Sequence, residues 1–130
     1  MPCEYNGEGI IKSLLNGDVS KIGYSFLSYL FSLQQKKGLE TFEQKNERYE
    51  ASFFKQCAED GDLSSVPIRL TDKLNRFKSL VKNPDLDPLD ESIKDTLMDL
   101  ANYATMALVY LEAVECDKAS QKVVSENAGE

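Results

Sequence analysis

The strongest constraint on the fold is a row of apolar residues near the C-terminus, spaced three and four residues apart. Such spacing places side chains on one face of an α-helix. The row consists of Leu89, Ile93, Leu97, Leu100, Ala104, Leu108 and Leu111. Asp87 and Pro88 precede it and are typical of a helix start. The pattern therefore predicts a long helix from about residue 88 to residue 117.

The opposite face of this helix carries three polar residues, Asp95, Asp99 and Asn102. Farther along, the same face continues with Met106, Val109, Tyr110 and Ala113. A helix that is apolar nearly all round is covered on both sides, and covered polar groups are costly unless they are paired. Two interpretations stay open: a polar cluster inside a bundle or an oligomer interface, and a solvent-exposed face.

Three more helices are predicted upstream. The first can be capped by Asp18 or Ser20 and ended by Gly38, and its apolar face is Ile22, Phe26, Tyr29, Leu30 and Leu33. The second runs from about residue 40 to 59, and the third from about residue 65 to the turn at Asn83 and Pro84. Neither strand-like alternation nor a glycine-rich phosphate loop occurs in the sequence.

The expected fold is therefore an all-α, four-helix, bundle-like single domain. Its 130 residues suffice for one core but not for two. We expect a loose N-terminal segment at residues 1–18, with one helical turn at 9–16. The helical bundle domain occupies residues 19–117, and a frayed polar tail occupies residues 118–130.

The third helix carries cations beside its apolar stripe, and the fourth carries acids. Arg69, Asp72, Lys73 and Arg76 fall at helical spacing. A short connection makes the two helices antiparallel neighbours and brings Asp99 near the level of Lys73 or Arg76. This arrangement is either a salt-bridge network that only holds the helices in register, or a binding site.

In a binding site, Arg69, Lys73 and Arg76 would hold phosphates. Asp95, Asp99 and Asn102 would bind Mg²⁺, ribose hydroxyls or a base edge. Tyr49, Phe53 and Tyr103 are core residues or rings that stack on a base. Glu40, Glu43, Glu47 and Glu50 form a solvated face of the second helix or add metal ligands opposite Asp95 and Asp99.

Composition excludes several classes of function. The chain has no histidine, which rules out histidine-dependent triads and ordinary zinc sites. Its net charge of −7 disfavours DNA, RNA and anionic membranes as partners. Cys3, Cys57 and Cys116 are odd in number and far apart, which suits a reducing cytoplasm, and the N-terminus has no signal-peptide pattern.

Three segments, "KNERYEASF", "RLTDKLNRFKSL" and "DESIKDTLMDLANYATMAL", resemble in this order the phage-associated family called nucleotide modification associated domain 1. The resemblance covers roughly residues 45–111. Glu50 stands where the family usually has a glycine. The resemblance implies an all-α protein connected with nucleotides and encoded by a phage. Its location would then be the cytoplasm of the infected bacterial host.

That family is distantly similar to all-α MazG-like and dUTPase-like pyrophosphatases, which hold Mg²⁺ with E-x-x-E on one helix and E-x-x-D on the next. Asp95 and Asp99 would take the place of the second motif, although they stand four rather than three positions apart. The first is replaced by Lys73-x-x-Arg76, and this exchange disfavours a cluster of Mg²⁺ ions. The similarity also implies a homo-oligomer, in which a neighbour partly covers the fourth helix.

Three functions follow as hypotheses. The first is a phage-type protein that binds a phosphorylated nucleotide or a nucleotide-derived signal and sequesters it from host defence, with no cofactor required. The second is a Mg²⁺-dependent nucleoside triphosphate pyrophosphohydrolase with Asp95 and Asp99 as metal ligands. The third is a helical inhibitor module that binds a protein and no small ligand.

Overall fold

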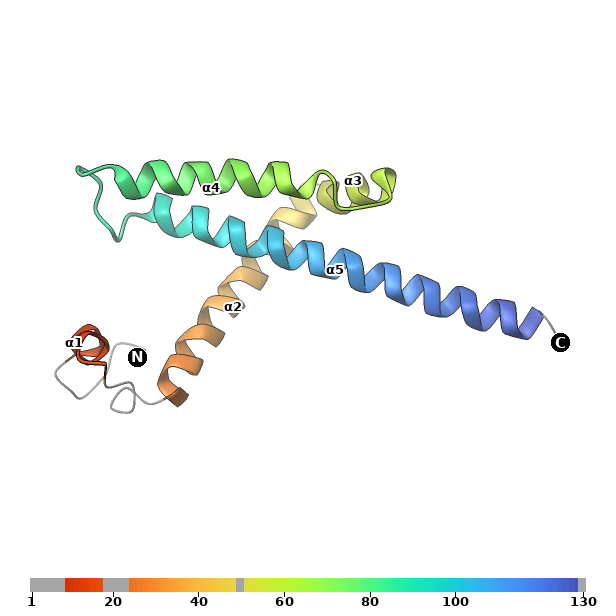
Figure 1. The fold of residues 1–130 in the computed structure, drawn as a ribbon, viewed down its shortest axis with the longest axis horizontal. Coiled ribbons are helices and arrows are strands. Elements are labelled where there is room, and N and C mark those ends of the chain that lie inside the picture. The colour runs from red at the N-terminus through yellow and green to blue at the C-terminus, as the bar shows by residue number, and fades with distance from the viewer. Residues whose placement is uncertain (1–8, 18–23, 49–50, 129–130) are drawn as a thin grey trace. The chain divides into compact units, whose positions relative to one another are not determined.

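The computed structural model describes residues 9–17, 24–48 and 51–128, and nearly all of them are helical (Figure 1). No strand occurs in these ranges, which confirms the predicted all-α class. The helices are α1 (Ile10–Leu15), α2 (Tyr24–Arg48), α3 (Ser52–Asp60), α4 (Val66–Lys82) and α5 (Glu91–Ala128).

The chain divides into two compact units, Met1–Thr41 and Phe42–Glu130. This boundary falls inside α2 and within the single bundle domain predicted for residues 19–117. The first unit contains α1, which occupies the position of the predicted turn at residues 9–16. The predicted helix caps, Asp18 and Ser20, lie outside the described residues. Every side chain discussed below as part of the site belongs to the second unit.

Gly38 does not end a helix, contrary to the prediction. It is buried inside α2, which continues to Arg48. A glycine costs a helix interior only about 1 kcal/mol relative to alanine, and good helix formers on both sides of Gly38 offset that cost. The glycine is therefore compatible with an uninterrupted helix.

The second predicted helix is also wrong, because the backbone leaves the helical conformation between α2 and α3. Ala51 has φ 57° and ψ 35°, which is the left-handed region. Its N–H donates to the carbonyl oxygen of Asn46 at 3.2 Å. A helix cannot pass through such a residue, so α3 takes a new direction from Ser52 onwards.

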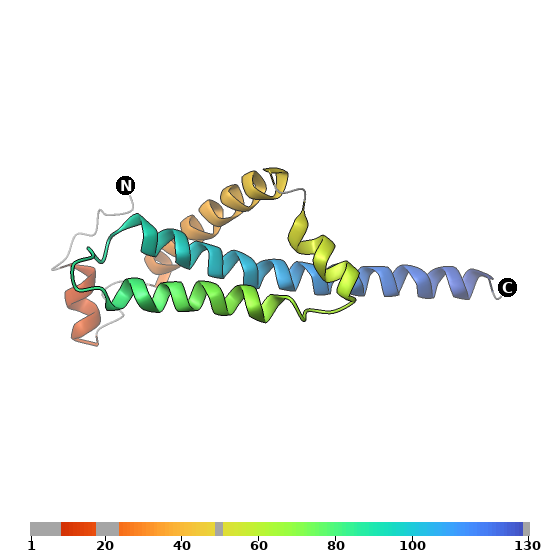
Figure 2. The ribbon, with the colours of Figure 1, turned by 90° about the horizontal axis from the view of Figure 1, so that it is seen from above.

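In the second unit, α4 and α5 form the predicted antiparallel pair and lie side by side in both ribbon views (Figure 2). Aspartate and asparagine side chains shape the turn between them. The carboxylate of Asp87 accepts a hydrogen bond from the N–H of Leu89, and that of Asp90 accepts one from the N–H of Ser92, each at 2.8 Å. Asp90 thereby caps α5, which begins at Glu91 rather than near residue 88.

The buried core of this unit comprises Phe53, Cys57 and Val66, each at most 5% exposed. The partly buried residues packed against it are Phe54, Leu63, Leu70, Tyr103, Met106, Ala107 and Tyr110. Of the residues contributed by α5, Tyr103, Met106 and Tyr110 lie on a face that projects away from Leu97 and Leu108 of the leucine row. That face is covered within the chain, whereas Leu97, Leu108 and Leu111 of the leucine row stay 43–67% exposed.

α5 continues through Ala128, so the predicted frayed tail from residue 118 is wrong. Residues 91–128 contain neither glycine nor proline. Each further residue adds one hydrogen bond once a helix has started, so elongation is favourable even where every side chain is solvated. Among the described helices, none is both long and apolar enough to cross a membrane.

Candidate functional site

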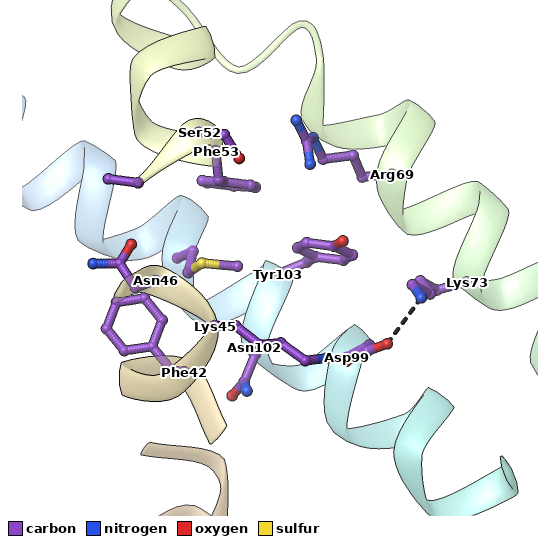
Figure 3. Close-up of a pocket in the computed structure, with 12 residues that line it drawn as sticks. Phe42, Lys45, Asn46, Ser52, Phe53, Arg69, Lys73, Asp99, Asn102 and Tyr103 are labelled. Carbon is purple, nitrogen blue, oxygen red and sulfur yellow. Dashed lines mark hydrogen bonds and ion pairs between the residues drawn. The ribbon is translucent and has the colours of Figure 1, made fainter. Parts of the chain in front are cut away.

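A pocket of about 350 Å³ opens where the last turns of α2 and the start of α3 face α4 and α5 (Figure 3). This volume lies within the ordinary range for small-molecule sites. The lining combines cationic, amide and aromatic side chains. It consists of Phe42, Lys45, Asn46, Ala51, Ser52, Phe53, Arg69, Lys73, Asp99, Asn102, Tyr103 and Met106.

Asp99 is the centre of the polar part of the pocket. One carboxylate oxygen accepts a hydrogen bond from Lys45 of α2 at 2.6 Å, and the other pairs with Lys73 of α4 at 2.8 Å (Figure 3). The Asp99 side chain is 17% exposed, against 29% for Lys73 and 51% for Lys45. A single carboxylate of α5 thus ties together α2 and α4.

The two lysines control the protonation of Asp99. Burial raises the pKa of this carboxyl, but hydrogen bonds from Lys45 and Lys73, reinforced by their charges, lower the pKa by more. The net result is a pKa below the ordinary value of 3.8. Asp99 is therefore ionised throughout the physiological range.

This depressed pKa predicts how stability depends on pH. The ion pairs stabilise the folded state fully above the unfolded-state pKa, and this contribution is lost as pH falls through the lower folded-state pKa. We expect Asp99→Asn to destabilise the protein at pH 7 by on the order of 1 kcal/mol. The difference from wild type should shrink below about pH 4. Urea unfolding of both proteins at pH 7 and pH 3 measures it, and a difference independent of pH would contradict the assignment.

Aromatic rings form the wall next to these charges. Phe53 and Tyr103 stack with their centroids 5.9 Å apart and their planes 12° from parallel. The guanidinium carbon of Arg69 lies 5.6 Å from the centroid of Phe53 and 6.0 Å from that of Tyr103 (Figure 3). Cation–π attraction holds Arg69 over the rings. The pocket thus joins an aromatic surface to a cationic one.

Five of the eight predicted site residues line this pocket: Arg69, Lys73, Asp99, Asn102 and Tyr103. They come together because α4 and α5 are antiparallel with Lys73 level with Asp99. The alternative interpretation of a merely solvated face fails for Asp99 and Asn102, since neither side chain is fully exposed.

The other three predicted residues, Asp72, Arg76 and Asp95, are exposed and lie outside the pocket lining. Arg76 instead donates through Nε to the hydroxyl of Thr96 at 3.3 Å. Thr96 is 2% exposed and donates to the carbonyl oxygen of Ser92 at 2.7 Å. The structure thus does not bring Asp72, Arg76 and Asp95 to the pocket. Arg76 shares a helical face with Arg69, and Asp95 with Asn102, but each lies about two turns farther along its helix, near the level of Thr96.

The geometry does not support the expected metal site. Both oxygens of Asp99 pair with lysines, and Asp95 is exposed four residues away. No group of three or more acidic, cysteine or histidine side chains that could hold a metal occurs among the described residues. Glu40, Glu43 and Glu47 are exposed and do not line the pocket, whereas Tyr49 and Glu50 fall outside the described residues.

Sequence reasoning missed Lys45 and its neighbours Phe42 and Asn46 as site residues. They lie on the last turns of α2, which a helical pattern alone cannot place against α4 and α5. For Lys45 and Asn46, however, the sequence does contain an indication. Both open the segment "KNERYEASF", one of the segments that carry the family resemblance.

Comparison with known proteins yields one match. The profile of the family described as nucleotide modification associated domain 1 matches residues 45–111, which include every residue lining the pocket except Phe42. No curated protein and no solved structure matches significantly. The more distant similarity to MazG-like pyrophosphatases is not shown by these comparisons. The family match spans more than half of the sequence, and the chain therefore belongs to the nucleotide modification associated domain 1 family.

Proposed function

We propose that the protein binds a small phosphorylated nucleotide, or a signal derived from one, in this pocket. The observation that carries the proposal is the composition of the lining. Lys45 and Lys73 flank a single carboxylate, and Arg69 lies over a pair of stacked rings in the same pocket. This local excess of positive charge occurs in a chain of net charge −7. The description of the family, which refers to nucleotide modification, agrees with it.

Each part of the lining suits one part of a nucleotide. Lysine and arginine side chains form charge-assisted hydrogen bonds with phosphate oxygens. Phe42 and Tyr103 are partly exposed rings on which a base can stack. Asn46 and Asn102 carry amides, which both donate to and accept from base edges and ribose hydroxyls.

The charge distribution also selects for the size of the ligand. A small anion is attracted by the three cations at short range, whereas the acidic body of the protein repels a long polyanion. A free nucleotide thus fits better than DNA or RNA. Among the described residues, no group of three or more side chains could hold a metal ion. This favours a protein that sequesters its nucleotide over one that hydrolyses it. Withholding a nucleotide signal from a host defence pathway is the biological role that we propose for it.

The direct test is calorimetry with a panel of nucleoside mono-, di- and triphosphates, on wild type and on Asp99→Asn. We expect triphosphates to bind wild type, and Asp99→Asn to bind them on the order of tenfold more tightly, which corresponds to about 1.4 kcal/mol. The substitution removes the carboxylate charge with which both lysines pair and which repels phosphate. The absence of any heat with every nucleotide at millimolar concentration would refute the proposal.

The same variant separates binding from hydrolysis. If Asp99 held a catalytic Mg²⁺, Asp99→Asn would abolish pyrophosphate release and weaken binding of the metal–nucleotide complex. If Asp99 is the counter-ion of two lysines, the variant binds more tightly and no pyrophosphate is released by either protein. Measuring pyrophosphate in the presence of Mg²⁺ or Mn²⁺ decides between the two.

A further inference from the structure

Asp99 occupies the position between Lys45 and Lys73 at which a ligand phosphate would bind. Its two carboxylate oxygens pair with the two ammonium groups at 2.6 Å and 2.8 Å (Figure 3). A ligand that is to form direct hydrogen bonds with both lysines therefore meets an anion that is already bound to them. Because Asp99 belongs to the same chain as the lysines, it competes at a high effective concentration. The pocket thus contains its own competitor for anions.

This competitor keeps its charge at neutral pH. The charged side chains that line the pocket are Lys45 from α2, Arg69 and Lys73 from α4, and Asp99 from α5. Burial raises the pKa of Asp99, but hydrogen bonds from both lysines, together with their charges, bring that pKa below its ordinary value. Protonation of Asp99 therefore does not clear the position for a ligand. An incoming anion has to displace the carboxylate or share the lysines with it.

The aromatic part of the pocket lies about one helical turn from this ion-paired group. On α4, Arg69 precedes Lys73 by four residues, and its guanidinium lies over the rings of Phe53 and Tyr103. On α5, Asp99 precedes Tyr103 by four residues. The rings and the lysines therefore face different parts of a ligand (Figure 3). A nucleotide with its base on the aromatic side presents its phosphates to the lysines.

A phosphodiester gains nothing by displacing Asp99. It carries a single negative charge, as each phosphate of a DNA strand does, and the carboxylate carries one as well. The exchange replaces one singly charged partner of the lysines by another. It also leaves Asp99, whose side chain is mostly buried, without its two cationic partners. An unpaired charge in such a position costs free energy, so the lysines should stay paired with Asp99.

A phosphomonoester offsets this cost. It carries about 1.5–2 negative charges at pH 7 and offers three acceptor oxygens. At equal distance, its attraction to each ammonium group is therefore nearly twice that of a carboxylate. The terminal phosphate of a nucleoside di- or triphosphate is also bound through a single ester or anhydride oxygen and leaves three oxygens exposed. Such a group competes successfully with Asp99 for both lysines.

We propose that Asp99 makes the pocket selective for nucleotides with a terminal phosphate, and that phosphodiesters such as 3′,5′-cyclic nucleotides are excluded. Asp99 is then the residue that determines specificity, since it occupies the lysines until a more highly charged group replaces it. The inference rests on the proposed nucleotide function and adds to it the kind of phosphate group that the pocket accepts.

The first test compares matched ligands on the full chain by calorimetry. One is the nucleotide that binds most tightly in the panel of mono-, di- and triphosphates, and the other is the same nucleotide with a methyl ester on its terminal phosphate. We expect the ester, and the 3′,5′-cyclic nucleotide with the same base, to bind at least about tenfold more weakly. Equal binding of nucleotide and ester would refute the selectivity and leave the nucleotide function standing. A panel without any binding would refute both.

The second test shows whether Asp99 causes the selectivity. NMR titration with the methyl ester measures its affinity for wild type, Lys73→Met, Asp99→Asn and the double variant. Lys73→Met should change ester binding by less than about twofold while Asp99 is present, and weaken it about tenfold in the Asp99→Asn background, where the lysines accept the ester. Lys78→Met, at an exposed lysine of α4 outside the pocket lining, is the matched control and should have little effect in either background. Equal effects of Lys73→Met with and without Asp99 would overturn the proposal.

Discussion

Replacing Lys45 and Lys73 together by alanine is expected to weaken binding of a nucleoside triphosphate by at least about 100-fold. A hydrogen bond to a charged group contributes about 1.5–3 kcal/mol, and two such bonds to phosphate would be lost. Asp99 would moreover remain in the pocket without its two lysines and repel the ligand. Calorimetry at constant ionic strength gives the change in dissociation constant.

The matched control for this experiment is Lys78→Ala combined with Lys82→Ala. These two lysines are exposed on α4 outside the pocket lining, so the control removes the same total charge from the protein. It should bind the nucleotide within about twofold of wild type, because screening weakens exposed charges beyond about 10 Å. Equal losses in both double variants would mean that general charge, rather than this pocket, attracts the ligand.

The largest effect on stability is expected at Phe53. This side chain is 5% exposed, stacks on Tyr103 and contacts Phe54 edge to face at 5.4 Å between centroids. Phe53→Ala should cost about 3–5 kcal/mol, because it leaves a cavity that the surrounding rings cannot fill. That loss is a large part of the 5–15 kcal/mol typical of a domain. Urea unfolding measures it.

Phe31→Ala is the control for the same chemical change at an exposed position, since Phe31 is 66% exposed on α2. It should alter the free energy of unfolding by less than about 0.5 kcal/mol. Phe53→Leu keeps most of the buried volume and is expected to remain folded where Phe53→Ala is not. A cost at Phe53 no larger than at Phe31 would contradict the assigned core.

Local patterns predict the helices well and their ends poorly. Apolar residues at spacings of three and four reveal α4 and α5, and the turn around Asn83 follows from asparagine, aspartate and proline. Gly38 shows the limit, because a low helix propensity becomes a break only where the surroundings do not support the helix. The left-handed conformation of Ala51 shows the reverse case. An alanine in the sequence gives no indication that its backbone is left-handed.

The candidate site was likewise predictable only in part. The sequence pairs Lys73 with Asp99, because a short turn between two helices fixes both their orientation and their approximate level. It cannot place Lys45, which reaches Asp99 from 54 positions away. Nor can it separate Arg76 and Asp95 from the pocket residues, because Arg76 shares a helical face with Arg69 and Asp95 shares one with Asn102. Only their level along the helices, about two turns away, keeps them out of the pocket.

The sequence by itself determined the all-α class, the antiparallel pairing of α4 with α5, the family, and the exclusion of histidine chemistry. These depend on composition and on periodicities within single helices. Only the tertiary structure decided that α5 buries the face with Tyr103 and leaves Leu97 and Leu108 exposed. The physical reason is that α5 is apolar nearly all round, so its own pattern allows either face inward. The face that α5 buries is determined by contacts with other helices, chiefly those of Phe53 with Tyr103 and of Lys73 with Asp99.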